Sequence, residues 1–311
     1  MDRQEHSAPF PRPTMITKRT AARIPANRPA SIAADRAARS RVASGPFPTD
    51  DSAIAARLSA WAREPGGLTG RDLRGCDLHG MVLDDADLRG TNLAGANLTG
   101  ASLRRANLDG VNLSGAVLTD ADCGGASFAG ACLDGTVAEC CRLAGVNVTG
   151  ATANGARWPG ADLSDATLTG LTATGLDLTH AVLDRSRARD ANLQDVRADY
   201  SRWRGARWDH VALCDATFLR ADFRQSRLAD CTLDSTRMAD SNWDAARWSH
   251  VTVGFGTSLR DAAMTTVQFD GCDARAIAVA GATLADHRRP ASSGRPALTV
   301  VGGRATIGRR S

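Results

Sequence analysis

Four arginines recur at one constant spacing, and their type and pattern suggest chemistry: Arg187, Arg207, Arg227 and Arg247. Three positions after each arginine stands an aspartate or a histidine in alternation, namely Asp190, His210, Asp230 and His250. Guanidinium groups at regular spacing bind carboxylates and phosphates through charge-assisted hydrogen bonds. If the fold stacks positions at this spacing, the pattern predicts a surface that recognises an acidic partner.

A purely structural interpretation of the same residues stays open. Asp190 and Asp230 can simply offset a stack of positive charge. The segment Ser201–Val211 is also closely repeated at Ser241–Val251, which indicates a local duplication that copied a workable surface. Metal binding by His210 and His250 is the weakest alternative, because two stacking steps put them about 10 Å apart. We therefore predict no metal site.

Residues for catalysis are missing from the sequence. It contains no nucleophile elbow, phosphate-binding loop or HExxH motif. We predict a protein that is not an enzyme and that has no cofactor. The eight cysteines form no CxxC pair and lack the spacing of a zinc site. Several, such as Cys76, Cys123 and Cys141, occupy positions that elsewhere hold alanine or leucine. They are expected to be small buried residues in a reducing compartment.

A repeat of five residues organises the chain. From Leu68 to Val253 every fifth residue is apolar, which makes 38 positions, 21 of them leucine. The residue two positions before each is mostly small, and two residues after it often stands glycine. We expect the apolar column to form the core, including Leu88, Leu93, Leu98, Leu103, Leu108, Leu113, Trp158, Trp203, Trp208, Trp243 and Trp248.

A period of five fits neither of the common elements. Helices bury residues every 3.6 positions and strands every second position. Five residues make one short extended segment and one corner, where glycine and aspartate tolerate a positive φ. Four such sides close one coil, and equivalent positions in successive coils lie about 4.8 Å apart. The positions of Arg187 and Arg207, which differ by four repeats, are therefore expected to stack.

The motif of a small residue, Asp or Asn, and Leu, followed by two variable residues, resembles the pentapeptide-repeat family, as in Ala96–Gly100. The resemblance covers residues 66–286. It implies an all-β fold, a right-handed quadrilateral β-helix, here with about 11 coils. The apolar column shifts by one residue after Val253, which places one inserted residue within Gly254–Thr257.

The ends of the chain differ from the repeats. Residues 1–48 are rich in proline and arginine and are predicted to be a disordered basic tail. Residues 49–65 are predicted to be a short N-terminal capping helix with Leu58 on its apolar stripe. Residues 287–311 form a second basic tail, with a possible hairpin around Gly302–Gly303.

These features predict a non-enzymatic scaffold that mediates protein–protein interaction, in a cytoplasmic bacterial protein without a membrane span. The basic tails are expected to make weak contacts with an acidic partner or nucleic acid. The first alternative is a DNA-mimicking protein that binds a topoisomerase (gyrase) and confers resistance, as some family members do. The nearly balanced charge of residues 180–286, 15 acids against 14 arginines, departs from that pattern. The second alternative is a secreted bacterial effector or secretion accessory without a cleavable signal. The partner and the oligomeric state stay open.

Overall fold

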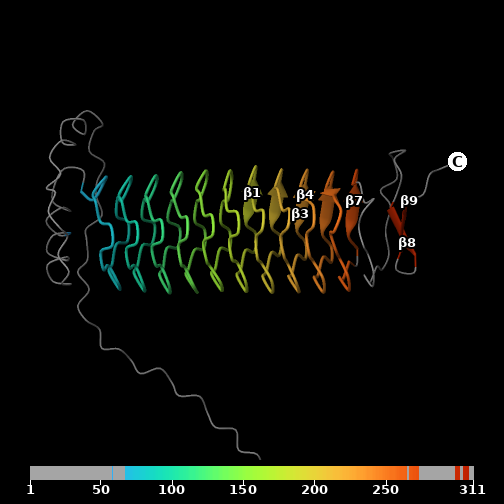
Figure 1. Cartoon of the computed structure of the whole chain (residues 1–311), viewed down its shortest axis with the longest axis horizontal. Helices are drawn as coiled ribbons and strands as arrows, with labels where there is room; N and C mark the ends of the chain where they lie inside the picture. The colour runs from blue at the N-terminus through green and yellow to red at the C-terminus, as the bar shows by residue number, and fades with distance from the viewer. Residues whose placement is uncertain (1–57, 59–66, 265, 273–297, 302–303, 308–311) are drawn as a thin grey trace, which may run out of the picture.

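The computed structural model describes Leu58 and residues 67–264, 266–272, 298–301 and 304–307. Residues 67–272 form a β-solenoid, in which one short coil stacks on the next along a single axis (Figure 1). The predicted all-β, pentapeptide-type β-helix is thereby confirmed. Residues 49–65 are described only at Leu58, which has a helical backbone and is buried. The capping helix, the count of coils and the two predicted tails extend outside the described residues and stay predictions.

Each coil has four sides. Parallel bridges join equivalent positions of successive coils, and the bridging position recurs every fifth residue, as in Asp77 with Asn97 and Val82 with Ser102. Because Asp77 and its partner Asn97 are four five-residue steps apart, the coil is quadrilateral, as the period predicted. Every side is only a few extended residues long, and the rest of each repeat is a tight turn.

Strands longer than a single bridge occur in the C-terminal half. They are β1 (Arg187–Arg189), β2 (Arg207–Asp209), β3 (Arg227–Ala229), β4 (Thr232–Leu233), β5 (Arg247–Ser249), β6 (Thr252–Val253), β7 (Gln268–Asp270), β8 (Leu298–Val301) and β9 (Arg304–Ile307). Five of them make one parallel sheet in the order β1-β2-β3-β5-β7, and β4 pairs with β6. β8 and β9 pair antiparallel, as expected for the predicted C-terminal hairpin.

The core is the apolar column of the repeat. Every residue predicted for it from Leu88 to Trp248 is at most 3% exposed. Large residues stack on small ones, as where Ala188 pairs with Trp208. Aromatic rings also stack on one another, and the centroids of Phe223 and Trp243 lie 4.0 Å apart. Packing of this kind leaves little free space inside the coil.

The corners have left-handed backbone. Gly150 has a φ of 65°, and residues with side chains adopt the same conformation, for example Asp190 at 52° and His210 at 54°. Glycine reaches this region without strain, and Asn or Asp do so more easily than other residues. The corner preference for Gly and Asp therefore follows from backbone sterics, as the sequence predicted.

The register shift after Val253 is one inserted residue. Leu233 still pairs with Val253, its regular partner, whereas Arg237 pairs with Ser258 in place of the regular Thr257. The corner amide of Asp215 donates to the carbonyl of Asp234, 19 residues on, whereas the corner amide of Ser235 donates to the carbonyl of Phe255, 20 residues on. The extra residue therefore lies between Val253 and Gly256. This is within the predicted segment Gly254–Thr257. Among the described residues, no helix is long and apolar enough to cross a membrane.

Candidate functional site

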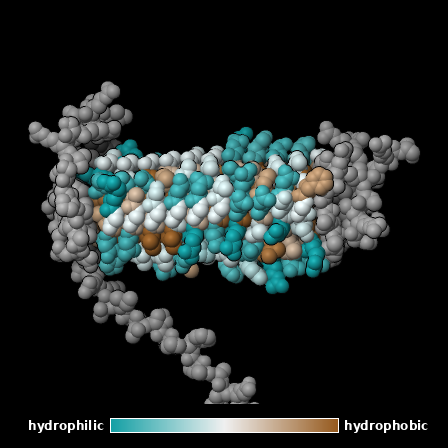
Figure 2. Space-filling view, viewed as in Figure 1, coloured by the Kyte–Doolittle hydropathy of each residue, from teal (hydrophilic) through white to brown (hydrophobic). Residues whose placement is uncertain are grey.

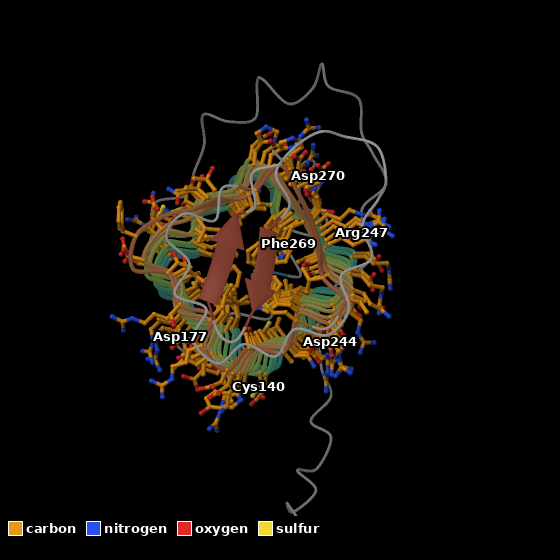
Figure 3. The ribbon with its side chains drawn as sticks, turned by 90° about the vertical axis from the view of Figure 1, so that its right-hand side faces the viewer. Cys140, Asp177, Asp244, Arg247, Phe269 and Asp270 are labelled. Atoms are coloured by element: carbon orange, nitrogen blue, oxygen red, sulfur yellow. The ribbon has the colours of Figure 1, made fainter. Side chains whose placement is uncertain are left out.

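The structure stacks the four predicted arginines on one outward column. In the sheet, Arg187 pairs with Arg207, Arg207 with Arg227, and Arg227 with Arg247. All four side chains are exposed. Viewed along the axis, Arg247 lies on the outer surface of the coil, whereas Phe269 lies inside it (Figure 3). We call Arg187, Arg207, Arg227 and Arg247 the arginine column.

Within the described chain, the arginine column makes no ion pair within 4.0 Å and no side-chain hydrogen bond. Arginines elsewhere on the solenoid are neutralised by contact. Arg185 lies 2.7 Å from Asp165 and Arg204 lies 2.6 Å from Asp222. Arginines such as these form ion pairs within the molecule. The arginine column has no such pair in the described chain, so its guanidinium groups can bind groups of another molecule.

The corner residues next to the arginine column do not neutralise it by contact. Asp190 lies 3.6 Å from Arg189, the last residue of β1, and not beside a member of the column. His210 Nδ1 lies 2.8 Å from Asp209. His250 lies 3.1 Å from Ser249 Oγ. The structure places Asp190, His210, Asp230 and His250 at one corner of successive coils, and within the described chain none of them forms an ion pair with the arginine column.

The arginine column has defined ends. The residues below it on the same side are Ser127, Asn147 and Thr167, and the residue above it is Gln268. All four are uncharged and polar. The positive charge is therefore confined to four successive coils. In the space-filling view most of the solenoid surface is hydrophilic or neutral, with only small hydrophobic spots (Figure 2).

Some acidic side chains on other faces are engaged with arginine. Burial disfavours the charged form of Asp222, but hydrogen bonds from Arg224 and Arg204 outweigh it and lower the pKa of Asp222 below its usual value. A hydrogen bond from Arg89 likewise lowers the pKa of Asp87 despite the opposing effect of burial.

An exposed aromatic cluster was missed by the sequence reasoning. The rings of His180 and Tyr200 stack with centroids 5.0 Å apart, and the guanidinium of Arg220 lies 5.8 Å from the Tyr200 centroid. Tyr200 is 48% exposed and the neighbouring Leu219 37%. The signal was available, because positions 180, 200 and 220 have the same spacing as the arginine column.

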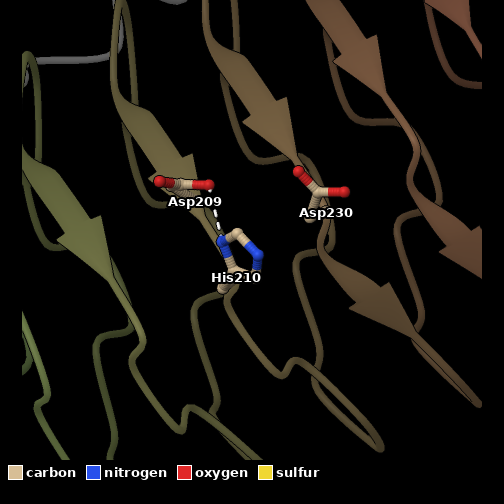
Figure 4. Close-up of side chains that lie close together, drawn as sticks. All are labelled: Asp209, His210 and Asp230. Carbon is tan, nitrogen blue, oxygen red and sulfur yellow. Dashed lines mark hydrogen bonds and ion pairs between the residues drawn. The ribbon is translucent and has the colours of Figure 1, made fainter.

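A second group that was missed lies at the corner beside the arginine column. Ligand atoms of Asp209, His210 and Asp230 all lie within 4.8 Å of one another (Figure 4). The sequence reasoning compared His210 only with His250, two coils away. It did not consider the carboxylates one residue before and one coil above His210.

The interior offers little room for a ligand. A cavity of about 20 Å³ lies beside Trp158, Thr136 and Ala138. It holds no more than about one water molecule. It lies where the small Ala138 stacks beneath Trp158, as Ala188 does beneath Trp208.

Two solved structures show what the chain is similar to. HetL, a pentapeptide repeat protein involved in heterocyst differentiation regulation in the cyanobacterium Nostoc sp. strain PCC 7120, is 24% identical, with 73% of this chain and 95% of HetL covered and a TM-score of 0.38. The plasmid-mediated fluoroquinolone resistance protein QnrB1 is 17% identical over 53% of this chain and 91% of its own, with a TM-score of 0.39. No curated protein sequence matches the chain significantly.

The family model for pentapeptide repeats matches eight copies in the chain. The matched residues are 68–100, 96–135, 141–179, 161–197 and 191–230, about half of the sequence. They coincide with the described coils and with the five-residue apolar column. The chain belongs to the pentapeptide-repeat family.

Proposed function

We propose that the protein is a non-enzymatic scaffold that binds another protein, and that the arginine column is its recognition surface for an acidic segment of that partner. The observation that carries this proposal is the stack of four exposed guanidinium groups without an acidic group of the described chain in contact. The partner presents carboxylates in a row, at a spacing that follows the stacked coils, about 4.8 Å.

Electrostatics favours an acidic occupant. Like charges a few ångströms apart repel one another by about 1 kcal/mol even in water. Adjacent members such as Arg207 and Arg227 repel in this way, and a row of carboxylates relieves the repulsion. A single exposed ion pair contributes only about 0.2–1 kcal/mol, so one contact would not suffice. Four stacked guanidinium groups, each able to form two hydrogen bonds to one carboxylate, provide both affinity and register.

The backbone that carries the arginine column is rigid. The amide of Arg207 donates to Ser186 O at 2.9 Å, that of Arg227 to Ala206 O at 2.8 Å. The side chain that follows Arg207, that of Trp208, is buried in the core. A surface that is already ordered loses less conformational entropy on binding. Only the arginine side chains need to be immobilised when the partner arrives.

The proposal extends to the ends of the chain and to the cellular setting. The arginine-rich tails at residues 1–48 and 287–311 strengthen attraction to an acidic partner or nucleic acid through salt-sensitive contacts. The protein works in the bacterial cytoplasm, where its cysteines stay reduced. Both statements are part of the proposal.

The test is a capture experiment with charge reversals on two faces. Three full-length proteins are immobilised: the unmodified protein, the double variant Arg207→Glu/Arg227→Glu and the double variant Arg197→Glu/Arg237→Glu. Lysate of the source organism is then passed over each. Arg197 and Arg237 are exposed on the side opposite the arginine column and make no ion pair with a described residue. They share the column of Asp177, which lies across the ring from Arg247 (Figure 3).

Both variants change the net charge equally and keep the tails. We expect the unmodified protein and the Arg197/Arg237 variant to capture the same acidic protein, and the Arg207/Arg227 variant to lose it. Circular dichroism must show the same β-solenoid in all three. Equal capture by both variants, or equal loss in both, contradicts recognition by the arginine column.

A further inference from the structure

The corner beside β2 brings together one imidazole and two carboxylates. Asp209 ends β2, His210 follows it at the corner, and Asp230 occupies the same corner one coil above. Their ligand atoms lie within 4.8 Å of one another. We propose that Asp209, His210 and Asp230 bind a divalent transition-metal ion such as Zn²⁺, with water completing the coordination.

The positions of the side chains agree with such a site. In Figure 4 the carboxylates of Asp209 and Asp230 lie on two neighbouring coils, and the ring of His210 lies between them. Asp209 Oδ1 and His210 Nδ1 are 2.8 Å apart. At this distance the two groups share a hydrogen bond, and they need to separate to about 3.4 Å to become neighbouring ligands of a tetrahedral zinc ion. Asp209 Oδ2 is held by Arg189 at 3.3 Å, which orients the carboxylate from outside the site.

The backbone under the site is fixed. The amide of His210 donates to Ala229 O at 3.0 Å, and the amide of Asp230 donates to Ser249 O at 2.9 Å. Both corner residues have a left-handed φ, 54° for His210 and 52° for Asp230. Binding therefore requires only rotations of three side chains. A pre-arranged set of ligands loses little entropy when the ion binds.

The surrounding charge selects the kind of ion. Arg189 contacts Asp209, and Arg207 and Arg227 project from the same side of the coil. These guanidinium groups repel every divalent cation, so only an ion that bonds strongly to the imidazole offsets the repulsion, and Mg²⁺ and Ca²⁺ prefer oxygen ligands. Zn²⁺, Co²⁺ and Ni²⁺ form stronger bonds to imidazole nitrogen. The site is therefore expected to take these ions and to reject Mg²⁺ and Ca²⁺.

The local duplication supplies an internal control. His250 is the copy of His210, but Ser249 stands where the first copy has Asp209. One coil above His250 the corner residue is Gly271, whose added Cβ would lie 2.5 Å from the His250 ring. His250 thus has the same corner geometry without the two carboxylates.

The experiment is an isothermal titration of the full chain with Zn²⁺, repeated with Mg²⁺. Four variants accompany the unmodified protein: His210→Ala, Asp230→Asn, and the matched controls His250→Ala and Asp190→Asn. Thiols such as exposed Cys140 also bind Zn²⁺. They are common to all five proteins, so the comparison between variants isolates the site.

We expect His210→Ala and Asp230→Asn to weaken the tightest Zn²⁺ binding at least tenfold, and His250→Ala and Asp190→Asn to leave it within about twofold. Mg²⁺ should give no comparable heat. Equal Zn²⁺ binding by His210→Ala and His250→Ala would overturn the proposal, and so would Mg²⁺ binding of similar affinity. Circular dichroism of each variant distinguishes lost binding from lost fold.

Discussion

The indole Nε1 of Trp158 donates a hydrogen bond to Thr136 Oγ1 at 2.9 Å, across one coil of the solenoid. Serine stands at the same relative position before two other tryptophans, Trp208 and Trp248. These are Ser186 and Ser226. Within the described chain, their buried hydroxyl groups and the two buried indole Nε1 groups have no hydrogen-bond partner. The same stacking position therefore holds a hydrogen-bonded indole at Trp158 and indoles without a described partner at Trp208 and Trp248.

Thr136→Ala should lower the free energy of unfolding by about 1–3 kcal/mol, because it leaves the buried indole of Trp158 without an acceptor. Ser226→Ala should be neutral or slightly stabilising, because the hydroxyl of Ser226 is already desolvated without a partner in the described chain. Urea unfolding followed by tryptophan fluorescence measures both. A loss at Ser226 as large as that at Thr136 would show that Ser226 bonds to Trp248 in solution.

Gly150→Ala should destabilise the solenoid by about 1–2 kcal/mol, the cost of placing an L-residue in left-handed backbone. Gly150 has a φ of 65°, and a Cβ added there meets no atom within 4 Å, so backbone conformation alone determines the effect. Gly150→Asn should cost less, because asparagine tolerates this region better. Thermal unfolding of the two variants gives the comparison, and an equal loss in both would contradict this account of the corners.

Leu103→Ala should cost about 2–5 kcal/mol, because Leu103 is completely buried in the apolar column and its truncation leaves a cavity. Thr152→Ala, on the outward position of a central coil, should change stability by no more than about 0.5 kcal/mol. Urea midpoints of the two variants measure the contrast. Similar midpoints would mean that the apolar column is not the core.

Acid should destabilise the protein partly through Asp222. Its pKa is lowered in the folded state, since the hydrogen bonds from Arg224 and Arg204 outweigh the effect of burial. The stabilisation is therefore present above the unfolded-state pKa, near 3.8, and is lost as pH falls through that value and then through the lower folded-state pKa. Asp222→Asn should flatten the decline in stability between about pH 5 and pH 3.

A matched control for this prediction is Asp215→Asn. Asp215 is exposed at a corner and makes no ion pair with a described residue. Its replacement should leave the slope of stability against pH unchanged. The two variants are compared by urea unfolding at several pH values. If Asp222→Asn retains the slope of the unmodified protein, the ion pairs of Asp222 contribute nothing to acid stability.

Most of the fold could be predicted because the five-residue period is a direct consequence of burial. Leu103 and Trp208 both belong to the apolar column, and a coil of four five-residue sides buries every position of that column. The inserted residue near Phe255 was also visible, because one extra residue shifts every later apolar position. Contacts between side chains were less accessible. The sequence does not show that the hydroxyl of Thr136 bonds to an indole whereas that of Ser226 does not, because side-chain rotamers decide whether the two groups meet.

The candidate site was predicted in outline and missed in detail. The constant spacing of the arginines placed Arg207 above Arg187, but it did not show that these arginines lack ion pairs within the described chain. Whether an arginine reaches an aspartate depends on χ angles, as in the pair of Arg185 and Asp165. The approach of Asp209 and Asp230 to His210 was missed because Asp209 is its neighbour along the sequence, whereas Asp230 is its neighbour in the next coil. The sequence reasoning did not consider the two kinds of neighbour together.

Recognition by the arginine column is tested most directly by fluorescence anisotropy with labelled poly-L-glutamate, titrated at about 0.15 M salt, where weak exposed charges are largely screened. The unmodified full chain and Arg197→Glu/Arg237→Glu should bind with similar affinity. Arg207→Glu/Arg227→Glu, with the same net charge and the same tails, should bind at least tenfold more weakly. Equal affinity of the two variants would contradict the assignment of the arginine column as the recognition surface.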